Sequence, residues 1–229
     1  MTQHLRLILI SALVLTCFES FAQRHFESNV ALGVKGGVTL SRVNFNPGIK
    51  QLWNIGETVG VSFRYIEEKH FGLLIEANIT KGGWKENFEG TNFSYQRDLT
   101  YLSFPILTHV FFGNSKIRGF FNLGPQLGYN ISEGVKSNFD YQNWQQINDF
   151  PSDNRHLDQL NLAVKNKFDY GLAAGAGAEF IIKRKHSFTL EGRLYYGLGN
   201  MFPSNKKDTF SASSNMSVSV TLGYSFRVN

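Results

Sequence analysis

The side chains of this chain that could do chemistry are mostly single charges placed between apolar residues. Eight of them occupy the polar positions of alternating segments: Lys35, Arg64, Glu76, Arg118, Glu179, Glu191, Arg193 and Arg227. His109 and Asp169 occupy equivalent positions. Charges that face one narrow interior must pair, because an unpaired buried charge is strongly penalised; the alternative is a path for protons or ions. We predict a paired, closed charge network.

A second candidate site lies in the polar segment "DFPSDNRHLDQLN" at 149–161, where His156 stands between Asp153 and Asp158. A histidine beside carboxylates can act as a general base or bind a metal. However, no serine, histidine and acid occur here at a readable spacing, and a lone histidine in a polar loop is usually solvated. We therefore predict no enzymatic activity, no metal and no cofactor.

Aromatic residues alternate with amides in "FDYQNWQQINDF" at 139–150. The rings are those of Phe139, Tyr141, Trp144 and Phe150. Exposed aromatic residues among amides suit the binding of a protein or a glycan, but the same rings can also pack on one another. Both alternatives stay open, and with His156 these residues form the predicted loop binding surface. The segment "NFEGTNFSYQ" at 87–96 is its expected neighbour.

The run "KFDYGLAAGAGAEF" at 167–180 resembles a glycine-rich phosphate loop in composition, with Gly171, Gly175 and Gly177 among alanines. A phosphate loop must lead into a helix N-terminus, which supplies amides and a dipole. This run instead alternates, with an apolar residue at every even position from Phe168 to Phe180. It is therefore predicted to be a strand whose glycines face a narrow interior.

The elements that must position these residues are strands, because apolar residues recur with period two. Eight segments alternate in this way: 30–40, 55–65, 71–80, 100–112, 117–131, 168–180, 188–198 and 216–226. Short connections at 67–70, 113–116 and 183–186 alternate with long ones at 45–54, 81–99, 132–167 and 199–215. Tight turns at one rim and long loops at the other are typical of a membrane barrel. We predict an all-β, eight-stranded antiparallel up-and-down transmembrane β-barrel.

A soluble barrel with an inward apolar face is the alternative, and the composition of the polar face argues against it. That face is mostly Gly, Ala, Ser, Thr and Asn, which suits the narrow lumen of eight strands. Aromatic residues near the strand ends suggest two interfacial girdles in contact with lipid. The predicted girdle residues are Phe71, Phe112, Phe188, Tyr224 and Phe226 at one end, and Trp53, Trp84, Tyr129, Phe168, Tyr170 and Tyr196 at the other.

The first residues, 1–22, are predicted to be a secretory signal peptide cleaved after Ala22, leaving residues 23–229 as one barrel domain. Cys17 raises the alternative of a lipoprotein, although Thr16 before it is unsuited to lipid attachment. Cys17 is the only cysteine, so the mature chain would have no disulfide. The net charge is +5, but the basic residues are scattered rather than clustered. We therefore predict no nucleic-acid partner.

Several segments together resemble the PorT-like outer-membrane β-barrel family of Bacteroidetes. They are "TYLSFPILTHVFF", "FFNLGPQLGYNIS", "FDYGLAAGAGAEF", "LEGRLYYGLGNMF" and "VTLGYSFRVN". The end "MSVSVTLGYSFRVN" also resembles the signal read by the outer-membrane assembly machinery. The resemblance implies a bacterial outer-membrane protein in contact with lipid. We expect a structural or binding role through the long loops, with an extracellular protein or glycan as ligand. The alternatives are an accessory of a secretion system, a narrow pore and an outer-membrane enzyme.

Overall fold

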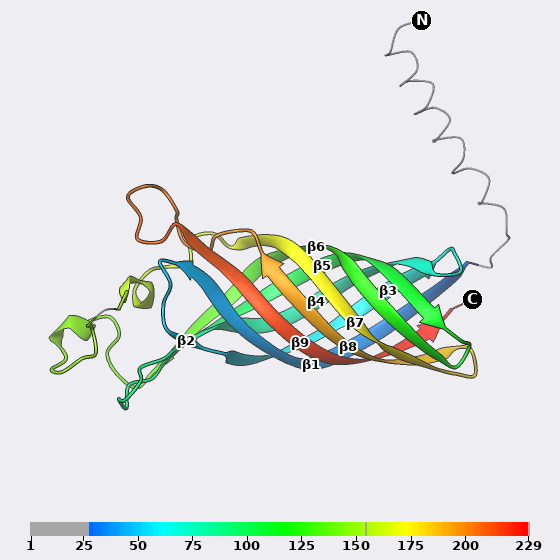
Figure 1. Ribbon diagram of the computed structural model, residues 1–229, viewed down its shortest axis with the longest axis horizontal. Helices are drawn as coiled ribbons and strands as arrows, with labels where there is room; N and C mark the ends of the chain where they lie inside the picture. Colours follow the sequence, from blue (N-terminus) through cyan, green and yellow to red (C-terminus); the bar gives the residue numbers. More distant parts are fainter. Residues whose placement is uncertain (1–27, 154, 229) are drawn as a thin grey trace, which may run out of the picture.

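The computed structural model describes residues 28–153 and 155–228, so the predicted signal peptide at 1–22 lies outside the described residues. Antiparallel strands wind into a closed ring (Figure 1). The ring consists of β1 (Asn29–Asn46), β3 (Asn54–Ile66), β4 (Phe71–Glu86), β5 (Tyr95–Gly113), β6 (Ile117–Ser137), β7 (Phe168–Ile182), β8 (His186–Gly197) and β9 (Ala212–Arg227). A short strand, β2 (Gln51–Leu52), pairs only with the end of β4.

The first and last strands close the barrel. β1 pairs with β9 from Ala31–Arg227 at one end to Asn46–Ala212 at the other. Each remaining strand of the ring pairs with its neighbours in sequence. A closed ring leaves no unpaired sheet edge, which is what a hydrocarbon surrounding requires. The predicted eight-stranded up-and-down barrel is confirmed.

The two rims differ as the sequence predicted. Tight turns at 67–70, 114–116 and 183–185 lie at one rim, together with the start of β1 and the end of β9 (Figure 1). The long connections lie at the other rim, and the largest, 138–167, carries the 3-10 helices Trp144–Gln146 (η2) and Asp158–Leu160 (η3). In membrane barrels the short turns face the periplasm and the long loops face outward, so we call the second rim the extracellular mouth.

The outer surface of the ring is apolar. Leu32, Val34, Ile55, Leu172 and Leu222 are among the large hydrophobic side chains left more than half exposed. Most predicted girdle residues lie on this surface, including Trp53 and Tyr196. Trp84 is the exception, because it is fully buried on the inner side of β4. Trp84 and Glu76 are an even number of residues apart in β4, so their side chains lie on the same, inner face. The prediction that Trp84 belongs to the girdle was therefore wrong.

The strands beside the mouth are longer than the alternation predicted. β4 continues to Glu86, β5 begins at Tyr95, and β6 continues to Ser137. A register shift between Thr100 and Tyr101 accompanies this extension. The predicted loop 81–99 is therefore largely a hairpin that stands above the lipid-facing band. Within the described part of the chain, no helix is long and apolar enough to cross a membrane.

Candidate functional site

Four of the predicted charges meet in the middle of the lumen: Lys35 on β1, Glu76 on β4, and Glu191 and Arg193 on β8. Arg193 binds both oxygens of Glu76, at 2.6 and 2.9 Å. It also donates to Glu191 Oε2 at 2.8 Å, while Lys35 Nζ lies 2.7 Å from Glu76 Oε2. Two cations thus neutralise two carboxylates. We call these four residues the central ion-pair group.

A second pair lies nearer the tight turns. Arg64 Nη2 is 2.6 Å from Glu179 Oε1, and both side chains are buried. Asn122 links this level to the central ion-pair group, because it donates to Glu191 at 2.9 Å and contacts His109 Nδ1 at 2.7 Å.

The two remaining predicted network residues, Arg118 and Arg227, are partly exposed, and no ion pair between described residues includes them. The Arg118 guanidinium lies 4.8 Å from the centre of the Phe111 ring instead. The structure therefore brings six of the eight predicted charges into pairs and leaves these two beside them.

Small residues make room for these charges. A Cβ at Gly175 would collide with the Glu191 carboxylate, and one at Gly177 would collide with the Phe120 ring. The glycines of β7 thus face the lumen, where larger side chains would displace the charges. The two cavities beside the ion pairs have about 40 and 30 Å³ for the centres of water molecules, and one water needs roughly 10–15 Å³. Each of these two cavities therefore has room for only a few waters beside the ion pairs.

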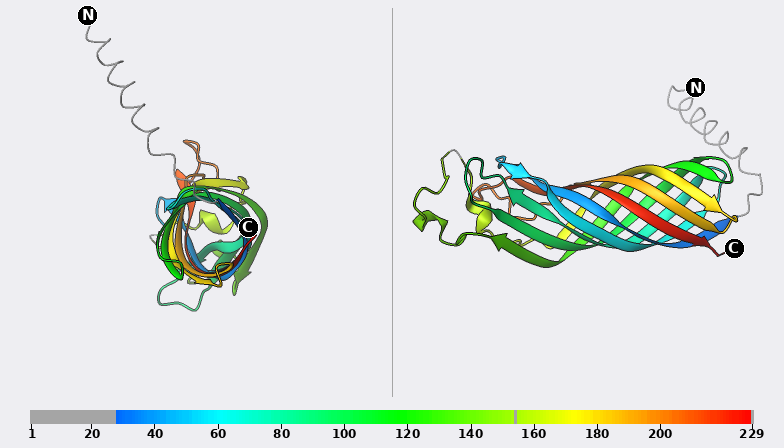
Figure 2. Two further views of the ribbon diagram at one scale, coloured as in Figure 1. Left: turned by 90° about the vertical axis from the view of Figure 1, so that its right-hand side faces the viewer. Right: turned by 90° about the horizontal axis from the view of Figure 1, so that it is seen from below.

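A large apolar cluster fills the extracellular mouth. We call it the mouth cluster; its members are Val43, Phe45, Trp84, Phe88, Tyr95, Leu99, Leu157, Leu160, Val164, Met201, Phe202 and Phe210. They come from strands and from three loops. The Phe45 ring contacts the rings of Trp84, Phe202 and Phe210, with ring centres 5.0–6.0 Å apart. Figure 2 shows the short helix η3 inside the outline of the ring. The long loop thus folds back and plugs the barrel.

Polar groups fix this plug to the strands. Trp84 Nε1 and Gln159 Nε2 both donate to Glu86 Oε1, each at 3.1 Å. Arg97 donates to the backbone oxygens of Gln159 and Leu162. Burial raises the pKa of Glu86 to about 7, since desolvation outweighs the two donated hydrogen bonds. The plug is therefore held by a carboxyl group that titrates near neutral pH.

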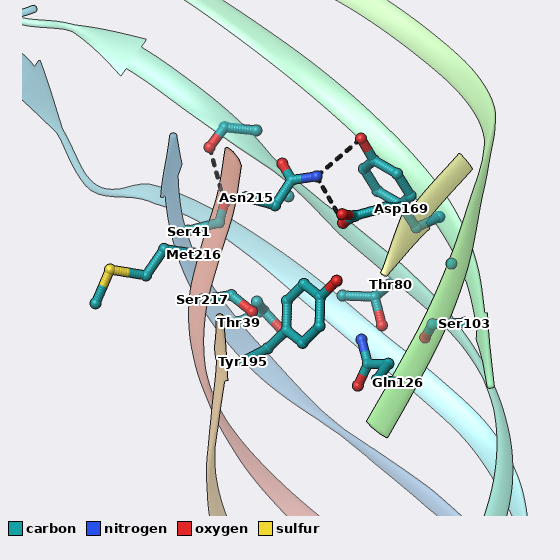
Figure 3. Close-up of a pocket in the computed structure, with 14 residues that line it drawn as sticks. Thr39, Ser41, Thr80, Ser103, Gln126, Asp169, Tyr195, Asn215, Met216 and Ser217 are labelled. Atoms are coloured by element: carbon teal, nitrogen blue, oxygen red, sulfur yellow. Dashed lines mark hydrogen bonds between the residues drawn. The ribbon is translucent and has the colours of Figure 1, made fainter. Parts of the chain in front are cut away.

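A further cavity is lined by residues of several strands of the ring, from Thr39 on β1 to Ser217 on β9, and Figure 3 shows these residues. It has about 50 Å³ for the centres of water molecules. Asn215 on β9 donates to Asp169 Oδ2 at 2.8 Å and to the Tyr101 hydroxyl at 3.0 Å. The other polar lining residues are Thr39, Ser41, Thr80, Ser103, Gln126, Tyr195 and Ser217. The cavity is thus lined by neutral polar side chains, three glycines and Met216 around one carboxylate.

The predicted loop binding surface is arranged differently from the expectation of exposed rings. Phe139, Tyr141, Trp144 and Phe150 are partly buried and pack on the mouth cluster. Phe139 and Phe150 meet at 5.1 Å between ring centres, and Trp144 and Phe150 at 5.6 Å. The structure thus shows the second alternative, in which the rings pack on one another. His156 is exposed, and among the described residues no three His, Cys, Asp or Glu side chains form a group that could hold a metal.

Sequence reasoning missed Glu86, Arg97, Gln159, Tyr195 and Asn215. For Glu86 a signal existed, since it shares the even parity of the lumen-facing residues of β4. Tyr195 similarly shares the parity of Glu191 and Arg193 on β8. Gln159 carries no such signal, because it lies in a loop whose contacts follow no period.

Comparisons with known proteins agree with this architecture. A family model described as an outer membrane protein beta-barrel domain matches residues 21–203, whereas no curated protein matches the chain. The outer membrane protein OprG from Pseudomonas aeruginosa is similar in structure, with a TM-score of 0.52 and 13% identity over 87% of this chain and 96% of that one. Ail, the attachment invasion locus protein of Yersinia pestis, is similar with a TM-score of 0.41 and 15% identity over 86% and 98%. At this identity the likeness to OprG shows the fold alone.

Proposed function

The chain belongs to the outer membrane protein beta-barrel domain family, and from this premise we propose that it is a closed barrel that binds ligands at its extracellular end. The outer membrane is its location, because the matched family and the apolar outer surface agree on it. The proposal concerns what the protein does there: the lumen acts as a rigid support, and the extracellular loops make the functional contacts.

The observation that carries this proposal is the double closure of the barrel. The central ion-pair group blocks the lumen with paired charges, and the mouth cluster fills the opening above it. A solute would have to displace both. Loops on a rigid scaffold are where binding residues usually occur, so the outward surface of the folded loops is the place for function.

That surface is rich in amides. With the aromatic rings turned inward, the tip of the long loop exposes Gln142, Asn143, Gln145, Gln146 and Asn148. Amides both donate and accept hydrogen bonds, which suits a ligand with many hydroxyl groups. The partly exposed Trp144 ring lies beside them. We therefore favour a glycan as the ligand class, with a protein as the alternative outcome.

A glycan array probed with the purified full-length protein in detergent micelles tests this proposal. The wild type should bind a restricted set of neutral glycans, and the double variant Gln145→Ala, Gln146→Ala should lose most of that binding. The matched control is Lys206→Ala, Lys207→Ala, which changes exposed residues of another loop and should bind normally. Absence of any glycan signal, or equal loss in both variants, would reject the ligand class.

Three finer expectations from the sequence belong to the same proposal. They are the PorT-like resemblance, export by a signal peptide cleaved after Ala22, and the absence of catalysis. Purification from outer membranes followed by N-terminal sequencing should yield a mature chain that starts at Gln23. A chain that starts at Cys17 would instead support the lipoprotein alternative.

A further inference from the structure

The tight-turn rim, at the right-hand end of the barrel in Figure 1, carries an excess of basic residues along part of its circumference. Six cations lie at the tight-turn ends of β6 to β9 or in the adjoining turns: Lys116, Arg118, Lys183, Arg184, Lys185 and Arg227. No ion pair between described residues includes any of them. The third tight turn, 67–70, has two glutamates beside Lys69 and His70 instead. The excess positive charge is therefore confined to one side of the rim, and we call these six residues the basic arc.

Backbone hydrogen bonds bring the members of the basic arc next to one another. The Ile181 amide donates to the Lys116 carbonyl oxygen at 2.7 Å, which places Lys116 beside the end of β7. The Arg227 amide donates to the Lys185 carbonyl oxygen at 2.8 Å, which places the end of β9 beside the turn 183–185. All three residues of that turn are exposed. Because like charges held close together repel one another, an anion that binds among them would be stabilised.

The backbone of the turn 183–185 is unfavourable for the residues that occupy it. Lys183 and Arg184 have φ angles of 52° and 60°, in the left-handed region that residues other than glycine rarely adopt. The Lys185 amide donates to the Ile182 carbonyl oxygen at 3.3 Å, so Lys183 and Arg184 are the two central residues of a tight hairpin turn. Such turns strongly prefer Asn-Gly or Asp-Gly at these positions. Strained residues of this kind are typical of functional sites, so we infer that the two charges are used.

The outer surface beside the basic arc is aromatic. We call His186, Phe188, Tyr224 and Phe226, at the ends of β8 and β9, the aromatic platform. The rings of His186 and Phe226 lie 5.4 Å apart, as do those of Phe188 and Tyr224. His186 Nδ1 lies 2.8 Å from the Tyr224 hydroxyl, and Phe188 and Phe226 are exposed on the lipid-facing side. Aromatic residues of this kind mark the interface between lipid and water, so the cations next to them lie at the level of lipid headgroups.

We propose that the basic arc and the aromatic platform together bind one anionic phospholipid of the periplasmic leaflet. Lys183, Arg184 and Lys185 donate to the phosphate oxygens, since lysine and arginine form strong charge-assisted hydrogen bonds with phosphate. Lys116 and Arg227 add positive charge from the neighbouring strand ends, and the aromatic platform contacts the acyl chains. A lipid fits this site better than a soluble anion, because the platform continues the lipid-facing band. The site lies at the opposite end of the barrel from the long loops and does not depend on the glycan proposal.

Native mass spectrometry of the full-length protein in a nonionic detergent tests the site. Added dioleoyl phosphatidylglycerol should form a saturable one-to-one complex at lower concentration than dioleoyl phosphatidylcholine, which carries no net charge. The double variant Lys183→Asn, Arg184→Gly removes two charges and installs the residues that the turn prefers. Each cation near an anionic lipid contributes about fivefold to binding, so this variant should bind phosphatidylglycerol at least about tenfold more weakly. Its Tm should equal or exceed that of the wild type, because the turn is no longer strained.

The matched control is Lys206→Asn, Lys207→Gly, which removes the same charge from exposed residues of a long loop and should bind phosphatidylglycerol as the wild type does. Heat-modifiable mobility on gels, which reports the closed barrel, checks the folding of each variant. If the double variant fails to fold, Lys116→Gln in the neighbouring turn decides, with an expected loss of about fivefold.

Three results would overturn the proposal. The first is that phosphatidylglycerol binds the wild type no better than phosphatidylcholine does. The second is that the folded variant of the basic arc binds phosphatidylglycerol as the wild type does. The third is that an excess of inorganic phosphate displaces the lipid, which would assign the basic arc to a soluble anion.

Discussion

The lumen and the extracellular mouth close the same barrel with different forces. In the lumen, strands hold the charges of Glu76, Glu191 and Arg193 at fixed places, and direct ion pairs fill a space too narrow for large side chains. At the mouth, strand ends and loop segments bring in aromatic and aliphatic side chains instead. The comparison shows that closure of the lumen depends on charge complementarity, whereas closure of the mouth depends on the apolar burial of loop segments.

The largest effect should come from breaking charge balance in the lumen. Arg193→Met leaves Glu76 and Glu191 with Lys35 as the only cation paired with them in the described part of the chain. Removing one partner of a buried ion pair costs about 3–5 kcal/mol, so the free energy of unfolding in urea, measured in lipid vesicles, should fall by that amount. Adding Glu76→Gln to Arg193→Met should recover much of the loss. A cost below about 1 kcal/mol, the value of an exposed pair, would contradict the buried network.

A smaller and more local effect is expected at the mouth. Leu160→Ala removes a side chain that is 1% exposed in the mouth cluster, and such truncations cost about 2–5 kcal/mol. Because the loop can detach without the barrel, the loss should appear as faster protease cleavage within 138–167 while urea unfolding of the barrel changes little. Lys165→Ala, at an exposed position of the same loop, is the control. Equal cleavage of both variants would show that the loop is not anchored by burial.

The pH response should also separate the two regions. The pKa of Glu86 is raised by burial to about 7, so the folded plug favours the neutral carboxyl. Its contribution is complete below the unfolded pKa near 4.5 and is lost as the pH rises through about 7. The loss should be on the order of 3 kcal/mol, visible as lower protection factors against hydrogen exchange at 157–164 above pH 7. Glu86→Gln keeps the acceptor oxygen without a charge and should abolish this dependence; an unchanged dependence would assign it to another group.

The smallest effect is expected at Arg118. The sequence placed it in the same network as Glu191, but it contacts the Phe111 ring and forms no ion pair with the described residues. A cation–π contact of a partly exposed arginine is worth about 0.5–1 kcal/mol. Arg118→Ala should therefore lower the unfolding free energy by less than about 1 kcal/mol. A loss as large as that of Arg193→Met would place Arg118 inside the network.

The strands and the lumen charges were predictable because alternation fixes which face a residue occupies. Glu76, Glu179, Glu191 and Arg193 could be assigned to one interior in this way. The same rule would have placed Trp84 inside, had its parity been preferred to its aromatic character. Whether a residue has an even or odd position in its strand does not, however, determine its ion-pair partner. The partner depends on the height of each residue in the lumen, which the register between strands sets.

The plug could not be derived from the sequence. Leu157 and Leu160 lie in a polar loop without period, and Phe202 and Phe210 of the same cluster come from another loop. Such contacts depend on how two irregular segments fold over the mouth. The strand ends near the mouth could not be derived either. β4, β5 and β6 continue above the lipid-facing band, where apolar and polar residues no longer alternate regularly. The alternating segments of the sequence therefore stop short of the strand ends.

The central claim is that both regions together close the barrel, so that the protein acts at its surface. Electrical recording of the purified wild-type protein in planar lipid bilayers tests this claim most directly. The account predicts no lasting open channel, because ion pairs block the lumen and the mouth cluster covers it. A sustained, large conductance of the wild type, abolished by antibodies or proteases that act on the extracellular loops, would contradict it.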